Sequence, residues 1–112
     1  MLIVISSQKP EFEGLVDPRF GRAQFFIAWD TESEKWEAHP NPAVGQSGGA
    51  GVAAAQFVID KKANVVLSGD FGPNASRALG GAGIDMALFS AEVDTVQSAV
   101  ELFTQGKLKR FA

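Results

Sequence analysis

Residues suited to binding an anion occur in three short segments of this 112-residue chain. The first segment follows Asp17 and contains Arg19, Phe20, Gly21 and Arg22. Its two guanidinium groups suit planar, bidentate contacts with anions. The same segment also fits a structural turn, in which Asp17 accepts hydrogen bonds from nearby backbone and Phe20 fills the core.

The other two segments are rich in glycine, and each leads into a predicted helix. They are residues 45–51, which include Gly48, Gly49 and Gly51, and residues 68–74, which include Gly69, Gly72 and Asn74. A helix that begins at such a loop directs unpaired backbone N–H groups and the positive end of its dipole toward an anion. The alternative is that these glycines serve only tight turns and close packing, since no phosphate-loop lysine follows them.

His39 is the only histidine in a chain that has no cysteine. Without cysteine, the chain cannot form a thiolate nucleophile or thiolate ligands for zinc or an iron–sulfur cluster. His39 is therefore the best soft metal ligand that the chain offers, although a single histidine on the wet face of a strand is commonly only a surface residue. We assign no catalytic residue, because no nucleophile motif accompanies His39.

Length and composition favour one folded domain over residues 1–112. Apolar residues make up 46% of the chain and charged residues 21%, which is typical of globular proteins. The formal net charge of −3 and the scattered basic residues argue against a nucleic-acid partner. No apolar run approaches the roughly 20 residues that span a bilayer, and the N-terminus lacks a signal-peptide pattern, so we expect a cytoplasmic protein without a membrane partner.

The apolar pattern predicts five strands and three helices. The strands are residues 2–5, 25–29, 63–67 and 84–89, which are mainly apolar, and residues 35–39, which alternate as in an edge strand with His39 on the wet face. The helices are residues 51–62, residues 75–79 and a last helix along Val93, Val96, Val100 and Phe103, with Asp94 and Gln97 spaced as a capping box.

These elements predict an α/β fold with a mixed five-stranded sheet of order 3-2-1-4-5 and helices on both faces, a three-layer arrangement as in ribonuclease-H-like folds. Ligands of such sheets collect outside the carboxyl ends of the parallel strands. We therefore expect three segments to meet there, namely residues 6–7, 48–51 and 68–74. An anionic ligand is the natural occupant of the crevice between them.

The order and spacing of these motifs resemble the dinitrogenase iron-molybdenum cofactor biosynthesis family, which includes NifX and the C-terminal domain of NifB-type proteins. The motifs that carry the resemblance are residues 17–22 followed by 25–27, residues 48–51, residues 68–75 with Leu79 and Gly83-Ile84, and the closing Gly106-Lys107-Leu108. Together they extend over nearly the whole chain. The resemblance also implies the ribonuclease-H-like topology.

The resemblance implies a non-enzymatic carrier that binds an iron–sulfur or iron-molybdenum cofactor, or a precursor, and transfers it between cluster-assembly proteins. Such a cluster is anionic, so helix N-termini, glycine-rich backbone and Arg19 or Arg22 would attract it. His39 would then ligate one metal reversibly.

Two other functions stay open at this point. The first is a binding or regulatory module for a phosphate-bearing small molecule, which the same anion-binding segments would suit. The second is a Mg²⁺-dependent phosphodiesterase, which requires Asp17 and Asp70 to lie within metal-bridging distance. We favour the second less, because Asp30 lies at a predicted hairpin, Asp85 begins its strand, and the net negative charge would repel a phosphodiester.

Overall fold

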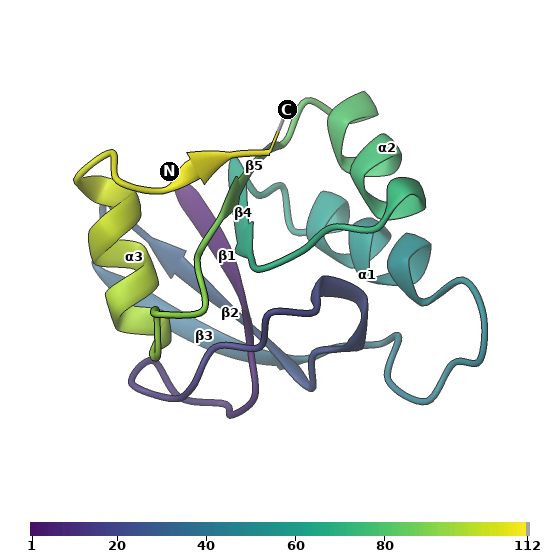
Figure 1. The fold of residues 1–112 in the computed structure, drawn as a ribbon, viewed down its shortest axis with the longest axis horizontal. Coiled ribbons are helices and arrows are strands. Elements are labelled where there is room, and N and C mark those ends of the chain that lie inside the picture. The colour runs from purple at the N-terminus through teal and green to yellow at the C-terminus, as the bar shows by residue number, and fades with distance from the viewer. Residues whose placement is uncertain (112) are drawn as a thin grey trace.

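The computed structural model describes residues 1–111, which form one mixed sheet with helices on both faces (Figure 1). In chain order the elements are β1 (Leu2–Ser7), the short 3₁₀ turn η1 (Phe20–Arg22), β2 (Phe25–Asp30), β3 (Lys35–Pro40), α1 (Ala50–Asp60), β4 (Val65–Ser68), α2 (Pro73–Gly81), β5 (Asp85–Leu88), α3 (Val96–Thr104) and β6 (Lys109–Arg110). The strand order is β3-β2-β1-β4-β5-β6.

The central strand β1 pairs antiparallel with β2 and parallel with β4. β2 and β3 form the predicted hairpin, and β5 lies parallel to β4. The predicted order of the first five strands is therefore confirmed, and so is the mixed α/β class. Membership of the ribonuclease-H-like fold class stays a prediction.

The predicted count of five strands is wrong, because β6 adds a sixth at the β5 edge. β6 has only two residues, both exposed and both charged, so it shows neither apolar content nor alternation. The pairing is held by the Phe111 N–H, which donates to the Met86 carbonyl (3.0 Å), and by an ion pair between Arg110 and Asp85 (3.0 Å).

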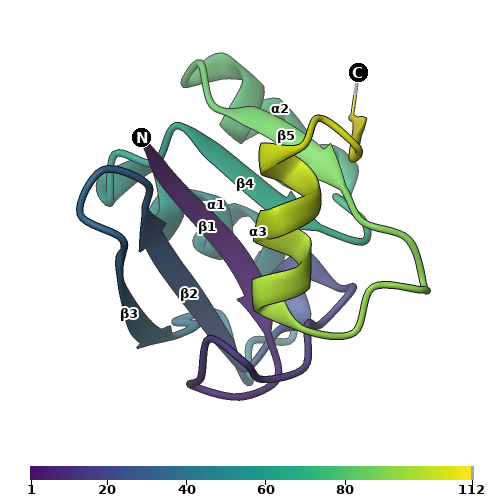
Figure 2. The same ribbon diagram turned by 90° about the vertical axis from the view of Figure 1, so that its left-hand side faces the viewer.

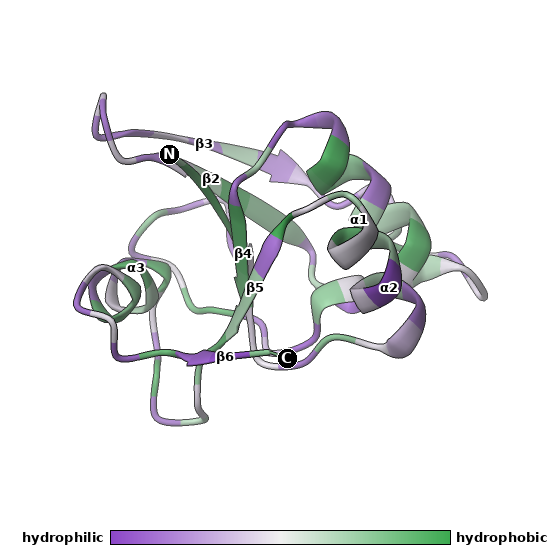
Figure 3. Cartoon of the chain, turned by 90° about the horizontal axis from the view of Figure 1, so that it is seen from above, coloured by the Kyte–Doolittle hydropathy of each residue, from purple (hydrophilic) through white to green (hydrophobic). Residues whose placement is uncertain are grey.

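Two apolar cores flank the sheet. α1 and α2 cover one face, and α3 covers part of the other, as seen from above in Figure 3. Val4 and Val66 point to the α1 side, whereas Ile3, Ile5 and Leu67 belong to the core under α3. Burial on both faces explains why β1 and β4 read as continuous apolar runs.

The last helix begins one residue later than a capping box of Asp94 and Gln97 requires. Thr95 is the N-cap, and its Oγ1 accepts a hydrogen bond from the Ser98 N–H (3.1 Å). The Asp94 carbonyl instead accepts from the Val16 N–H (2.9 Å), so Asp94 belongs to the preceding loop contact. No helix within residues 1–111 has both the length and the apolar character needed to cross a bilayer.

Candidate functional site

A cavity of about 410 Å³ lies where η1 meets the N-termini of α1 and α2. We call it the glycine-loop cavity. It is lined by Arg19, Phe20, Gly21, Arg22, Gly48, Gly49, Ala50, Gly51, Val52, Asp70, Gly72, Pro73, Asn74 and Ala75. The structure therefore brings together the predicted anion-binding residues except Gly69, whereas residues 6–7, which were also expected to meet there, are buried and do not line the cavity.

Glycine and alanine allow the three walls of this cavity, η1 and the N-terminal turns of α1 and α2, to pack closely. A Cβ atom on Gly21 would lie 3.2 Å from the Cα and N atoms of Gly51. A Cβ atom on Gly51 would lie 3.4 Å from the Ala75 Cβ. Glycine at 21 and 51 thus lets η1, α1 and α2 approach one another through backbone.

Both helix N-termini at the cavity lack a side-chain cap. α1 follows Gly49, which has a left-handed backbone (φ 73°), and α2 follows Gly72 with Pro73 at its first position. Within residues 1–111, no protein acceptor bonds the N–H groups of Ala50, Gly51 and Val52 in α1. These amides and the helix dipoles therefore remain available to a ligand.

The first backbone N–H groups of α2 also lack a protein acceptor among the described residues. Pro73 has no N–H, and across the described part of the chain the N–H groups of Asn74 and Ala75 also find no protein acceptor. The Asn74 side chain lines the cavity as well and adds an amide that can donate hydrogen bonds. Two helix N-termini thus direct unpaired donors at one volume.

Asp17 fixes the position of Arg19. The Arg19 Nε and Nη2 atoms donate to the two carboxylate oxygens of Asp17 (3.2 Å each), and the Arg19 N–H donates to Oδ1 (2.9 Å). The Asp17 side chain is 3% exposed, whereas that of Arg19 is 67% exposed. The hydrogen bonds that Arg19 donates to Asp17 and the negative charge of Asp17 raise the pKa of Arg19, which stays cationic at the cavity.

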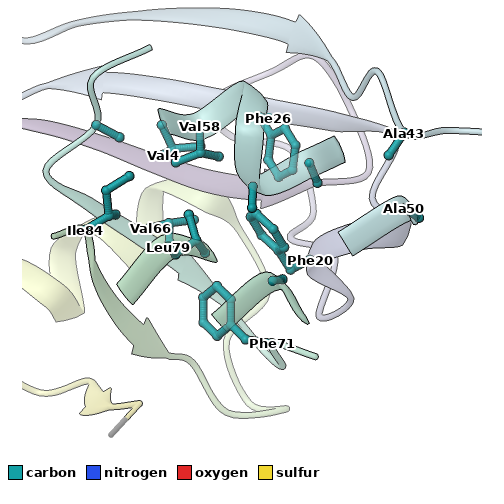
Figure 4. Packing of buried hydrophobic residues seen from close by; sticks show 14 of the residues in the cluster. Val4, Phe20, Phe26, Ala43, Ala50, Val58, Val66, Phe71, Leu79 and Ile84 are labelled. Atoms are coloured by element: carbon teal, nitrogen blue, oxygen red, sulfur yellow. The ribbon is translucent and has the colours of Figure 1, made fainter. Parts of the chain in front are cut away.

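The turn interpretation of residues 17–22 is therefore confirmed, and the guanidinium groups are nevertheless left at the cavity. Asp17 accepts from nearby backbone, as predicted. Phe20 is buried between Phe26 and Phe71, with ring centroids 5.3 Å from each (Figure 4). The two interpretations of this segment describe different side chains of one turn.

The loop before α1 is anchored by two side chains. Arg22 Nη1 donates to the Gln46 carbonyl (3.2 Å). Asn41, which is buried, donates to the Ala23 carbonyl and accepts from the Ala43 N–H (2.9 Å each). Asn41 was not predicted as a site residue from the sequence. Its place between Pro40 and Pro42 was the available signal, because asparagine in a turn commonly bonds nearby backbone.

Gly69 does not line the glycine-loop cavity and instead packs closely against Pro18. A Cβ atom there would lie 2.6 Å from the Pro18 Cβ and 2.8 Å from its Cα, so the two loops touch at this point. Below them, the Ser6 hydroxyl bonds the Asp17 carbonyl (2.6 Å) and the Ser68 hydroxyl (2.7 Å). The end of β1 thus contributes a buried polar anchor beneath the site.

His39 does not line the glycine-loop cavity. It lies on β3 opposite Phe26 and packs edge-on against Phe57 of α1, with ring centroids 5.6 Å apart. Its side chain is half-buried, which differs from the wet face expected, because α1 covers this side of β3. The Nε2 atom is buried and has no hydrogen-bond partner in the described part of the chain. Burial, together with the nearby positive charge of Lys61, lowers the pKa of His39.

Asp17 and Asp70 belong to neighbouring segments, since Arg19 and Asp70 form an isolated parallel bridge. Both carboxylate oxygens of Asp17, however, are bonded to Arg19. Among residues 1–111, no three histidine, aspartate or glutamate side chains gather in a way that could hold a metal ion.

Known proteins share both the sequence pattern and the fold. The sequence profile of the dinitrogenase iron-molybdenum cofactor family matches residues 1–106. The apo form of the orange protein from Desulfovibrio gigas is 38% identical, with a TM-score of 0.93, and the alignment covers 99% of this chain and 92% of that one.

Two further relatives are a putative NifB protein from Thermotoga and an uncharacterized protein of Methanocaldococcus jannaschii. The first is 30% identical with a TM-score of 0.84, over 97% of this chain and 91% of the other. The second is 26% identical over 99 residues, which are 86% of this chain and 82% of the relative. The chain therefore belongs to the dinitrogenase iron-molybdenum cofactor family.

Proposed function

We propose that this protein is a non-enzymatic carrier that binds an anionic iron–sulfur or iron-molybdenum cofactor, or a precursor, in the glycine-loop cavity and transfers it between cluster-assembly proteins in the cytoplasm. The observation that carries the proposal is the convergence of two uncapped helix N-termini and two arginines on one cavity. Family membership supports a cargo related to metalloclusters, and the orange protein, whose structure is described as an apo form, supports a removable group.

The cavity offers hydrogen-bond donors and two cationic side chains beside the carboxylate of Asp70, but no soft ligand. Its donors are backbone N–H groups, the Asn74 amide and the guanidinium groups of Arg19 and Arg22, and no imidazole or thiolate is among its lining residues. Such a set suits an anionic cluster held by charge and hydrogen bonds. Binding without coordinate bonds would also leave the cargo free to exchange.

The predicted ligand role of His39 is a separate proposal. The half-buried position of His39 against Phe57, outside the cavity, does not support it. A His39→Ala variant tests that role independently of the anion site.

Binding of a phosphate-bearing small molecule is the second candidate, because the same donors recognise phosphate. A Mg²⁺-dependent phosphodiesterase finds less support. Its proposed ligand Asp17 already bonds Arg19 through both carboxylate oxygens.

The test is anaerobic incubation with an isolated iron–sulfur precursor or with iron-molybdenum cofactor, followed by gel filtration and metal analysis. We expect iron or molybdenum to co-elute with the wild type and to be lost from Arg22→Ala. Arg77→Ala is the matched control, since Arg77 is exposed on α2 but does not line the cavity.

Retention that is equal in all three proteins would contradict the site. If the wild type retains no metal, the carrier proposal fails, and nucleotides and inorganic phosphate become the ligands to titrate. Retention that drops in His39→Ala would restore His39 as a ligand.

A further inference from the structure

The face of the sheet that carries α3 is only partly covered. α3 packs against β1 and lies beside β2 and β3, as Figure 2 shows, with no helix in front of those two strands. Trp29 of β2 and Trp36 of β3 pair directly across this uncovered half. Trp29 is half-buried and Trp36 is 42% exposed.

The loop after β1 places one aromatic ring on this half of the sheet. Phe12 stacks on Trp29 (centroids 4.7 Å apart, planes at 25°) and lies near-parallel to Trp36 (6.2 Å, 19°). The loop is held to α3 by two backbone bonds, in which the Gln97 and Val96 N–H groups donate to the Phe12 and Gly14 carbonyls (2.9 and 3.0 Å). The three rings therefore form a supported surface, which we call the aromatic surface.

Carboxylates surround the aromatic surface. On one side, a cavity of about 420 Å³ is lined by Phe12 and Trp29 together with Glu34 and Glu101. On the other side, a cavity of about 320 Å³ is lined by Glu11, Phe12, Glu13 and Trp36.

These four glutamates are exposed, and none of them takes part in a salt bridge within residues 1–111. No lysine or arginine lines either cavity. Lys35, the neighbour of Trp36, points to the opposite face, because successive side chains of a strand alternate.

We infer that the aromatic surface docks a basic segment of another protein, one in which arginine or lysine side chains flank an apolar side chain. Indole rings attract cations over their faces, and the surrounding carboxylates supply the complementary charge. The apolar side chain would cover Trp36, which is exposed, and the accessible part of the half-buried Phe12. A second copy of this chain fits poorly, because face-to-face contact would bring eight carboxylates together.

This surface uses elements other than those of the glycine-loop cavity. The cavity is built from η1 and from the starts of α1 and α2, whereas the aromatic surface is built from β2, β3, α3 and the loop after β1. A partner protein can thus dock without blocking the cavity. The inference does not rest on the identity of the cargo.

Intrinsic fluorescence tests the inference directly. The chain contains two tryptophans and no tyrosine, and both tryptophans belong to the aromatic surface. The probe is a tryptophan-free peptide of alternating arginine and leucine, compared with the same peptide carrying citrulline in place of arginine. We expect a saturable change in emission with the arginine peptide, weakening as salt is added, and roughly tenfold weaker binding of the citrulline peptide.

The double variant Glu34→Gln and Glu101→Gln should weaken binding of the arginine peptide roughly tenfold. Glu37→Gln is the matched control, because Glu37 is exposed on β3 but its side chain lies on the other face of the sheet. Equal affinity for both peptides would overturn the inference, as would equal losses in the double variant and in Glu37→Gln. Sedimentation showing a dimer of the wild type that Trp36→Ser abolishes would also overturn it, since the occupant would then be a second copy.

Discussion

The three α-helices within residues 1–111 begin in two different ways. At α3, every N–H group of the first turn has a protein acceptor: Val96 and Gln97 donate to the loop after β1, and Ser98 donates to Thr95. At α1 and α2, glycine occupies the cap position and the first amides have no acceptor among the described residues. The start of α3 therefore has its backbone N–H groups bonded within the protein, whereas the starts of α1 and α2 leave N–H donors for a ligand.

The largest expected effect on stability comes from Phe20, whose ring packs in the core beside the uncapped starts of α1 and α2. Phe20 holds the arginine-bearing turn to the core and is 2% exposed. Phe20→Ala should lower the free energy of unfolding by about 3 to 5 kcal/mol, since it leaves a cavity between Phe26 and Phe71. Urea denaturation followed by circular dichroism measures this. A loss below about 1 kcal/mol would mean that the turn is held by something other than this ring.

A second change removes the internal acceptor at α3. Thr95→Ala should cost about 1 kcal/mol of stability, because the Ser98 N–H loses its partner. Binding of anions at the glycine-loop cavity should not change, since Thr95 is on the opposite side of the sheet. Paired denaturation and ligand titrations check both statements, and weaker binding would show that the two helix starts are coupled.

A third change gives α2 a side-chain N-cap, as Thr95 provides for α3. Gly72 has an extended backbone (φ −67°, ψ 164°), and a Cβ atom there would meet nothing within 4 Å, so a capping side chain fits. Gly72→Asp should raise the free energy of unfolding by about 0.5 kcal/mol and weaken anion binding roughly tenfold. Gly72→Ala separates the cap from the mere presence of a side chain. Unchanged anion affinity in Gly72→Asp would remove α2 from the site.

The smallest effect concerns His39, whose buried Nε2 has no hydrogen-bond partner among residues 1–111. Burial lowers its pKa below the ordinary 6.5, so the unfolded chain binds the proton more readily than the folded one. Stability should therefore fall as the pH drops from about 7 through 6.5 to the folded pKa. His39→Phe should flatten this part of the stability profile, and an unchanged profile would assign the pH dependence to other groups.

Much of the fold could be predicted from the sequence, because a strand that is buried on both faces shows as a continuous run of apolar residues. β1 and β4 are apolar up to the serines at their ends, and the hairpin strand β3 alternates. β6 could not be predicted in this way, because its two residues are charged and exposed and are held by backbone pairing and the Arg110–Asp85 ion pair. The position of His39 was missed because its burial depends on Phe57, which belongs to a helix across the sheet face.

In the candidate site, the sequence likewise could not distinguish the roles of individual glycines. Gly69 and Gly72 stand in one loop and look alike in sequence, yet one packs against Pro18 and the other opens onto the cavity. The glycine content of the loop predicted that it would contribute to an anion-binding site. Only the path of the neighbouring Pro18 decides which glycine has room for a ligand.

The contact of Gly21 with Gly51, and of Gly51 with Ala75, has a consequence for the thermodynamics of loading. Because the three walls already touch through backbone, their relative positions are set when the chain folds. Cargo that enters this cavity then loses its own freedom without having to order the protein, which favours rapid exchange at a given affinity. Calorimetry of a small oxyanion binding to this cavity should accordingly show only a small heat-capacity change, because little apolar surface becomes buried.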